Sequence, residues 1–159
     1  MEVKDRIKNA FREFLAKDIH LLKVKANERS ITHHFANYVA AQFPDYNVDC
    51  EYNRKDLNPK RLVSFKKNVD SDDTKGVTIF PDVIVHHRGT QNNHVVIEAK
   101  TSAYKADCQL NDACRCDRCK LKVIKEELGY KYAFYIVFPV DVALAGYSEE
   151  TINNFITEI

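Results

Sequence analysis

The sequence predicts a single α/β domain spanning residues 1–159, in which helices flank a central four-stranded mixed sheet. Three observations support this fold class. The chain has 159 residues, of which 45% are hydrophobic, enough for one buried core and short for two. Three segments repeat apolar residues every three or four positions, as amphipathic helices do: 3–15, 27–43 and 106–128. Four segments have the apolar patterns of strands: 46–52, 77–87, 94–100 and 132–138.

The predicted helices begin and end at residues suited to those positions. Asn27 can cap the second helix through its side chain, and Pro44 stops that helix. Gly129 closes the helix at 106–128, because glycine readily adopts the left-handed conformation found at helix C-caps. The first helix, at 3–15, is an addition to the N-terminal side of the core, and the apolar segment 19–24 is too short to assign.

Two of the predicted strands form a hairpin around the turn-rich segment 88–93. Within the first of them, Pro81 cannot donate a ladder hydrogen bond, so the chain should bend there or lie at a strand edge. The stretch before the hairpin is mostly polar, although 62–65 could form a short extended piece. Beyond the last strand, residues 148–159 are predicted to form a short helix.

Three charged residues stand on these otherwise apolar strands. Side chains alternate between the faces of a strand, so Glu98 and Lys100 share one face. Burying such charges costs on the order of several kcal/mol per ion unless partners or a metal ion compensate. The hairpin brings Asp82 near Glu98, and two neighbouring carboxylates favour a hard cation between them. A buried Glu98–Lys100 salt bridge, with Asp82 as a turn residue, is the alternative.

Glu28 is a further candidate for this site. It precedes Ile31 by three positions, Phe35 by seven and Val39 by eleven, so it projects from the buried face of its helix. A carboxylate in the first helical turn is also stabilised by the helix dipole alone. Glu28 could therefore join a metal site or only stabilise its helix.

The motif resembles the signature of the PD-(D/E)XK, or restriction-endonuclease-like, nucleases: Pro81-Asp82, then fifteen residues, then Glu98-Ala99-Lys100. The resemblance covers about residues 27–138 and implies a core ordered as helix, three strands, helix and strand (αβββαβ). It implies that Asp82, Glu98 and the backbone carbonyl of Ala99 bind Mg²⁺ or Mn²⁺, and that Lys100 activates or orients the attacking water. Glu28 matches a glutamate that many members add from the first core helix.

The resemblance implies a Mg²⁺-dependent phosphodiesterase, most simply a deoxyribonuclease serving restriction, repair or defence. A cation held by two carboxylates lowers the pKa of a bound water and polarises the scissile phosphate, while a lysine stabilises the developing charge. Two other classes are open. The chain could be a catalytically silent nucleic-acid-binding or protein-interaction module with the same fold, or a zinc- or iron–sulfur-binding regulatory protein.

The charge distribution gives modest support for a nucleic-acid partner. The net charge is only +1, so overall charge does not indicate a polyanion partner. A local basic cluster could contact phosphates, or it could be a solvated loop. Its members, together with a lysine just past the motif, are Arg54, Lys55, Lys60, Arg61, Lys66, Lys67 and Lys105.

Four of the five cysteines fall within twelve residues: Cys108, Cys114, Cys116 and Cys119. Four thiolates could bind Zn²⁺ or an iron–sulfur cluster. A continuous helix through these positions argues against this, because four sulfurs along one helix cannot all converge on one tetrahedral ion. Core or surface thiols are the alternative.

The sequence predicts a cytoplasmic protein without a membrane partner. Its longest apolar run, 133–140, is too short to span a bilayer. Its amino terminus alternates charged and apolar residues, where a signal peptide would have an unbroken apolar segment. The N-terminal helix lies outside the motif, and it could serve in homodimerisation or simply in packing.

Overall fold

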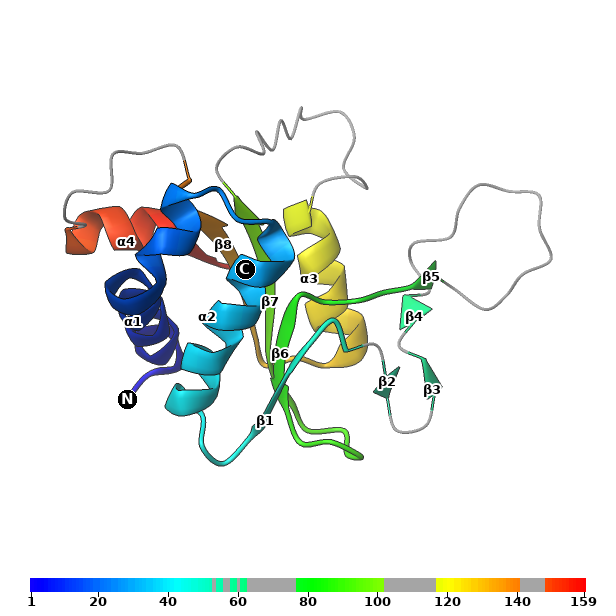
Figure 1. The fold of residues 1–159 in the computed structure, drawn as a ribbon. Helices are drawn as coiled ribbons and strands as arrows, with labels where there is room; N and C mark the ends of the chain where they lie inside the picture. The colour runs from blue at the N-terminus through cyan, green and yellow to red at the C-terminus, as the bar shows by residue number, and fades with distance from the viewer. Residues whose placement is uncertain (53, 56–57, 60, 63–76, 102–116, 141–147) are drawn as a thin grey trace.

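The structure, a computed structural model, describes residues 1–52, 54–55, 58–59, 61–62, 77–101, 117–140 and 148–159 (Figure 1). At its centre lies a five-stranded sheet of order β1-β6-β7-β8-β9. These strands are β1 (Asn47–Cys50), β6 (Val83–His86), β7 (Asn93–Thr101), β8 (Tyr132–Phe138) and β9 (Ile156–Glu158).

The sheet is mixed, as the sequence predicts. Strands β1, β6 and β7 pair antiparallel in sequence order, and β6 and β7 form the expected hairpin. Strand β8 pairs parallel to β7, and α3 (Asp117–Leu128) lies in the connection between them. Parallel neighbours require such a crossover, because a tight turn can only reverse the chain. Strand β9 then pairs antiparallel to β8.

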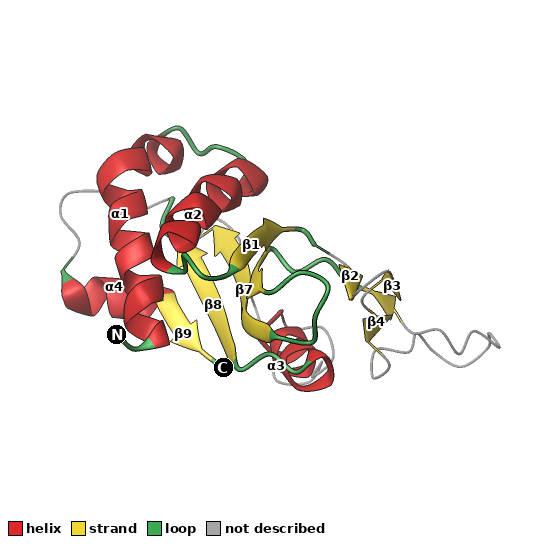
Figure 2. Cartoon of the chain, turned by 90° about the horizontal axis from the view of Figure 1, so that it is seen from below, coloured by secondary structure: helices red, strands yellow, loops and turns green. Residues whose placement is uncertain are grey.

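Helices cover both faces of this sheet. Figure 2 shows α1 (Val3–Lys23), α2 (Glu28–Gln42) and α4 (Glu149–Phe155) on one face, and α3 on the other. The cap predicted at Asn27 is present, since its side chain accepts a hydrogen bond from the Ser30 amide at 2.8 Å. Gly129 has the predicted positive φ of 69° at the end of α3. No helix within the described ranges is long and apolar enough to cross a membrane.

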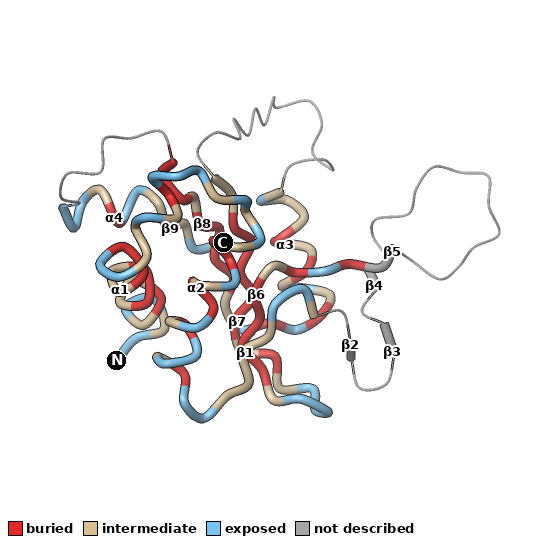
Figure 3. Tube along the Cα trace, in the orientation of Figure 1, coloured by how far each residue is buried: buried red, intermediate tan, exposed pale blue. Residues whose placement is uncertain are grey.

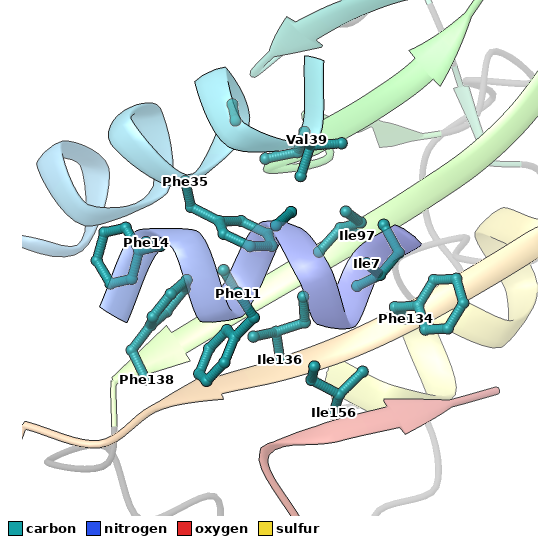
Figure 4. Close-up of a cluster of buried hydrophobic side chains, with 14 of the residues drawn as sticks. Ile7, Phe11, Phe14, Phe35, Val39, Ile97, Phe134, Ile136, Phe138 and Ile156 are labelled. Atoms are coloured by element: carbon teal, nitrogen blue, oxygen red, sulfur yellow. The ribbon is translucent and has the colours of Figure 1, made fainter. Parts of the chain in front are cut away.

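The larger core layer lies between the sheet and helices α1 and α2. Figure 4 shows aromatic and aliphatic side chains from both helices meeting β7, β8 and β9. The ring of Phe138 lies 5.2–5.5 Å from the ring centroids of Phe11, Phe14 and Phe35. Burial follows this layering, with the central strands almost entirely buried (Figure 3).

A smaller core layer lies beneath α3. Leu121, Ile124 and Leu128 of this helix pack on the opposite face of the sheet, against Ile84 and Val96. That face is the one on which side-chain alternation also places Glu98 and Lys100. Glu98 and Lys100 therefore project from the sheet on the face that α3 covers.

The structure corrects three details of the sequence prediction. The sheet has five strands rather than four, because Ile156–Glu158, which begins with two β-branched residues, extends along β8 where a helix through 159 was expected. The first helix continues to Lys23 past a kink at Asp18, whose φ and ψ are −120° and 17°, so the helical stripe resumes at Leu22. The segment 77–87 divides at Pro81 into β5 (Val77–Thr78) and β6.

Two short two-stranded sheets stand beside the central sheet, past α3 (Figure 1). One joins β2 (Arg54–Lys55) to β3 (Asn58–Pro59), and the other joins β4 (Arg61–Leu62) to β5. Position 62 is thus extended as expected. Residues 63–65, and the first part of the helix predicted at 106–128, lie outside the described residues.

Candidate metal centre

Two carboxylates face each other across neighbouring strands of the sheet. The register pairs Val83 with Ile97 and Ile84 with Val96. One further step along this register places Asp82 opposite Glu98, where Cβ atoms of cross-strand partners are about 5 Å apart. The structure therefore brings together the two acidic residues that the sequence singled out.

Pro81 shapes the backbone at this point. The same register places it opposite Ala99, whose amide donates a 2.8 Å hydrogen bond to Oδ2 of Asp82. In a strand, the amide and carbonyl of one residue point to the same side. Proline has no N–H, so it cannot supply the ladder hydrogen bond to the Ala99 carbonyl. The ladder between β6 and β7 therefore ends here, and the Ala99 carbonyl is directed toward the side on which Asp82 lies.

Lys100 links these strands to α2. Its Nζ lies 3.4 Å from Oε1 of Glu98 and 3.4 Å from Oε1 of Glu28. The other oxygen of Glu28 accepts a hydrogen bond from the Thr101 amide at 3.2 Å. Glu28 thus holds both the end of β7 and its lysine, and its side chain is 37% exposed rather than fully buried.

The two carboxylates resist ionisation at this position. Glu98 is only 5% exposed. Burial and the nearby Asp82 raise its pKa to about 7, against the opposing charges of Lys120 and Lys100. Burial also raises the pKa of Asp82, although the Ala99 amide and Lys100 oppose this shift. A second positive charge between the carboxylates would relieve both effects.

Lys100 remains a cation in this environment. Burial disfavours its charged form, but the carboxylates of Glu98, Asp82 and Glu28 outweigh burial and raise its pKa. A charged lysine here can offset negative charge on a bound anion but cannot act as a base at neutral pH. The lysine therefore suits electrostatic stabilisation.

The donor set fits a small divalent cation by its chemistry. Within the described part of the chain, no three His, Cys, Asp or Glu side chains are gathered closely enough to hold an ion by themselves. Magnesium, however, is commonly bound by one or two carboxylates and several waters. Asp82, Glu98 and the Ala99 carbonyl would supply three oxygens of the kind this ion prefers, and water would supply the others.

A cavity of about 220 Å³ opens onto this site from the α2 side. Asp82 and Glu28 are part of its wall, and the lining also includes Arg29, Thr32, His33, Cys50 and Glu51. Thr32 is 6% exposed, and its hydroxyl has no hydrogen-bond partner among the residues that the structure describes. The cavity provides a path by which a ligand can reach Asp82.

The first turn of α3 is a neighbour of the site that the motif did not reveal. The positive charge of Lys120 lowers the pKa values of both Asp82 and Glu98, against the effect of burial. The charge of Asp117, in the same turn, adds to the raised pKa of Glu98. The crossover topology was the available indication, since the helix of a β–α–β unit begins at the carboxyl end of the first strand.

Most members of the predicted basic cluster and cysteine cluster lie outside the described residues or have side chains that the structure does not describe. Arg54 and Lys55 are on β2 and Arg61 is on β4, but their side chains are not described. The other basic candidates, Lys60, Lys66, Lys67 and Lys105, lie outside the described residues, as do Cys108, Cys114 and Cys116. Cys119 is a half-buried free thiol on α3.

No family model, curated protein or solved structure matches this chain. The assignment of a function therefore depends on the chemistry of the site and on the fold that positions it.

Proposed function

We propose that this protein is a divalent-metal-dependent nuclease that hydrolyses phosphodiester bonds, with DNA as its substrate. One observation carries the proposal. Glu98 is buried on β7, and the half-buried Asp82, just before β6, lies opposite it in the register; both carboxyls have raised pKa values, and a charged lysine lies beside them. This arrangement is costly without a cation, and it holds a charged lysine beside the carboxylates where the lysine can offset the charge of an anion, so it suits hydrolysis of a phosphate ester.

The fold supports the same proposal. The order α2, β1, β6, β7, α3, β8 is the order that the resemblance to PD-(D/E)XK nucleases implies, with three antiparallel strands and a fourth strand parallel to the third. Helix α1 and strand β9 are then additions on either side of this core. The motif residues occupy the two central strands, β6 and β7, or the positions flanking them.

The residues have distinct roles in the proposed reaction. Asp82, Glu98 and the Ala99 carbonyl would hold Mg²⁺ or Mn²⁺, and the ion would supply polarisation of the phosphate and a water of lowered pKa. Lys100 stabilises negative charge on the attacking hydroxide or on the phosphate oxygens. Glu28 positions Lys100 through the 3.4 Å contact.

Cleavage of labelled single-stranded DNA, double-stranded DNA and RNA with Mg²⁺ or Mn²⁺ tests the proposal. We expect cleavage of DNA by the wild type, and its loss in Asp82→Asn, Glu98→Gln and Lys100→Gln. Matched controls are Asp45→Asn, Glu126→Gln and Lys122→Gln, which change exposed residues of the same types and should retain activity. Equal behaviour of all seven proteins on all three substrates would contradict the proposal.

Metal binding gives a second readout that does not require the substrate. Titration calorimetry with Mn²⁺ should detect an ion bound by the wild type and by the three control variants. Asp82→Asn and Glu98→Gln should each weaken this binding, because each removes a charged ligand. Unchanged Mn²⁺ affinity in both variants would place the ion elsewhere.

A further inference from the structure

Helix α3 is fixed at its end by a hydrogen bond to the start of β7. The side-chain amide of Asn93 donates to the carbonyl of Leu128 at 2.7 Å, and Asn93 is itself buried. Because α3 connects two parallel strands, it runs antiparallel to both. Its first turn therefore lies beside the carboxyl ends of β7 and β8 (Figure 1), which is the edge that holds Glu98 and Lys100.

The level of each helical residue along β7 follows from this anchor. Eight residues separate Leu128 from Lys120, a length of about 12 Å at 1.5 Å per helical residue. The same length corresponds to about four residues of a strand at 3.3 Å each. Lys120 is therefore level with about residue 97 of β7, next to Glu98.

A direct contact confirms this level. The guanidinium carbon of Arg118 lies 5.0 Å from the ring centroid of Tyr135. Tyr135 is the partner of Glu98 in the register of β7 and β8, so the two side chains are neighbours on the α3 face of the sheet. The first turn of α3 thus reaches the strand position of the candidate metal ligand.

Lys120 differs from Lys100 in having no ion-pair partner within the described part of the chain. It is half-buried, next to Leu121 and one turn before Ile124, both of which pack on the sheet. It makes no hydrogen bond or ion pair with any residue that the structure describes, whereas Lys100 is held by Glu98 and Glu28. Burial and Asp82 raise the pKa of Glu98, and Lys120 opposes this shift more strongly than Lys100 does.

We propose that Lys120 is a second phosphate-contacting lysine, which binds a phosphate oxygen of the nucleic-acid substrate from the α3 side of the carboxylate pair. This inference rests on the proposed function. An unpaired ammonium beside a site built for a cation and a phosphate has the charge, the reach and the freedom to bind that anion. Lys100 and Lys120 would then contact the substrate from two elements, β7 and α3.

The salt dependence of nucleic-acid binding tests this contact directly. Fluorescently labelled DNA is titrated at several NaCl concentrations and constant Mg²⁺, in a Lys100→Gln background that prevents cleavage. Lys120→Met should weaken binding and reduce the slope of log K against log salt by about one, the effect of losing one phosphate contact. Lys120→Arg should restore the slope, because the positive charge is retained.

Lys122→Met is the matched control, since Lys122 lies two residues further along α3 on its exposed side. Its slope should equal that of the Lys100→Gln parent. In the otherwise wild-type chain, Lys120→Met should reduce kcat/KM for cleavage at least tenfold, and Lys122→Met should not. A role in folding alone would predict an unchanged salt slope for Lys120→Met, and that result overturns the inference.

The outcomes separate this inference from the proposed function. If the wild type cleaves DNA and Lys120→Met matches Lys122→Met in slope and kcat/KM, the phosphate contact is wrong and the nuclease stands. If the wild type binds nucleic acid without cleaving it, the nuclease proposal fails, while a lower slope in Lys120→Met still supports the contact. If the wild type does not bind any nucleic acid, both are wrong.

Discussion

Lys100 and Glu28 lie 72 positions apart in the sequence, yet Nζ of the lysine is 3.4 Å from a carboxylate oxygen of the glutamate. The same carboxylate accepts a hydrogen bond from the backbone amide of Thr101. This pair of contacts joins the start of α2 to the end of β7. Glu28 thus gives the lysine a second carboxylate partner besides Glu98, so Glu28 and Lys100 should act as one unit.

We therefore expect the effects of Glu28 and Lys100 substitutions to be strongly non-additive. Glu28→Gln should lower kcat for DNA cleavage by about tenfold to a hundredfold, the range seen when a supporting partner is lost. In the Lys100→Gln background, the same change should have little further effect, because its target is gone. Single-turnover rates of the four proteins measure this, taken at high enzyme concentration and long times so that the residual cleavage of the two Lys100→Gln proteins can be followed. Multiplicative losses would show that Glu28 acts independently of Lys100.

The raised pKa of Glu98, about 7, predicts how the stability of the metal-free protein depends on pH. A carboxyl whose folded-state pKa exceeds its unfolded value favours the fold when protonated. Its contribution is complete below about pH 4.5 and is lost as the pH rises through 7, an effect on the order of 3 kcal/mol. Urea unfolding in EDTA between pH 5 and 8 should show this loss.

Glu98→Gln is the control for the pH dependence, because glutamine does not titrate. Burial lowers the pKa of His94, which gives the opposite trend over the acid part of this range. The useful quantity is therefore the free energy of unfolding of Glu98→Gln minus that of the wild type. It should grow from pH 5 to pH 8, and a difference that stays constant would mean that Glu98 has an ordinary pKa.

Pro81 should matter for metal affinity more than for folding. Pro81→Ala restores an N–H opposite Ala99, and this N–H can donate to the carbonyl that we assign to the metal. A net hydrogen bond of about 1 kcal/mol would compete with the ion and weaken Mn²⁺ binding roughly fivefold. Calorimetry compares this variant with Pro44→Ala, which removes an exposed proline after α2. Equal Mn²⁺ affinities would argue against the carbonyl as a ligand.

The aromatic core between α1, α2 and β8 should determine much of the stability. Phe138 is fully buried among three phenylalanine rings, so Phe138→Ala should cost about 3–5 kcal/mol of unfolding free energy. Phe80 is 54% exposed, and Phe80→Ala should change stability far less. Urea denaturation measures both, and similar losses in the two variants would contradict the burial seen here.

The neighbourhood of Asp82 and Glu98 could be predicted because local rules determine it. Strand alternation sets the face of Glu98, and a short hairpin sets its partner strand. The contact of Glu28 with Lys100 was beyond such rules, since it depends on how α2 packs against the sheet. The sequence pattern gave only the face of the helix, and the side chain proved half-exposed.

Other parts of the fold escaped prediction for different physical reasons. A three-residue strand such as β9 has no periodicity of its own, and pairing with β8 decides its conformation. For the segment 77–87, the sequence predicted a bend at Pro81 but not a separate strand β5. Strand β5 pairs with the short β4, and this pairing has no signal in the sequence pattern. The place of Lys120 beside the carboxylates depends on the crossover from β7 to β8, which spacing alone does not reveal.

Anomalous scattering from a crystal soaked in Mn²⁺ locates the ion that the proposed nuclease requires. We expect a peak between the carboxylates of Asp82 and Glu98, with an oxygen of each at about 2.1 Å, and no such peak in Glu98→Gln. A Mn²⁺ peak bound elsewhere, with Lys100 still between Glu98 and Glu28 and no ion at Asp82, would contradict this expectation.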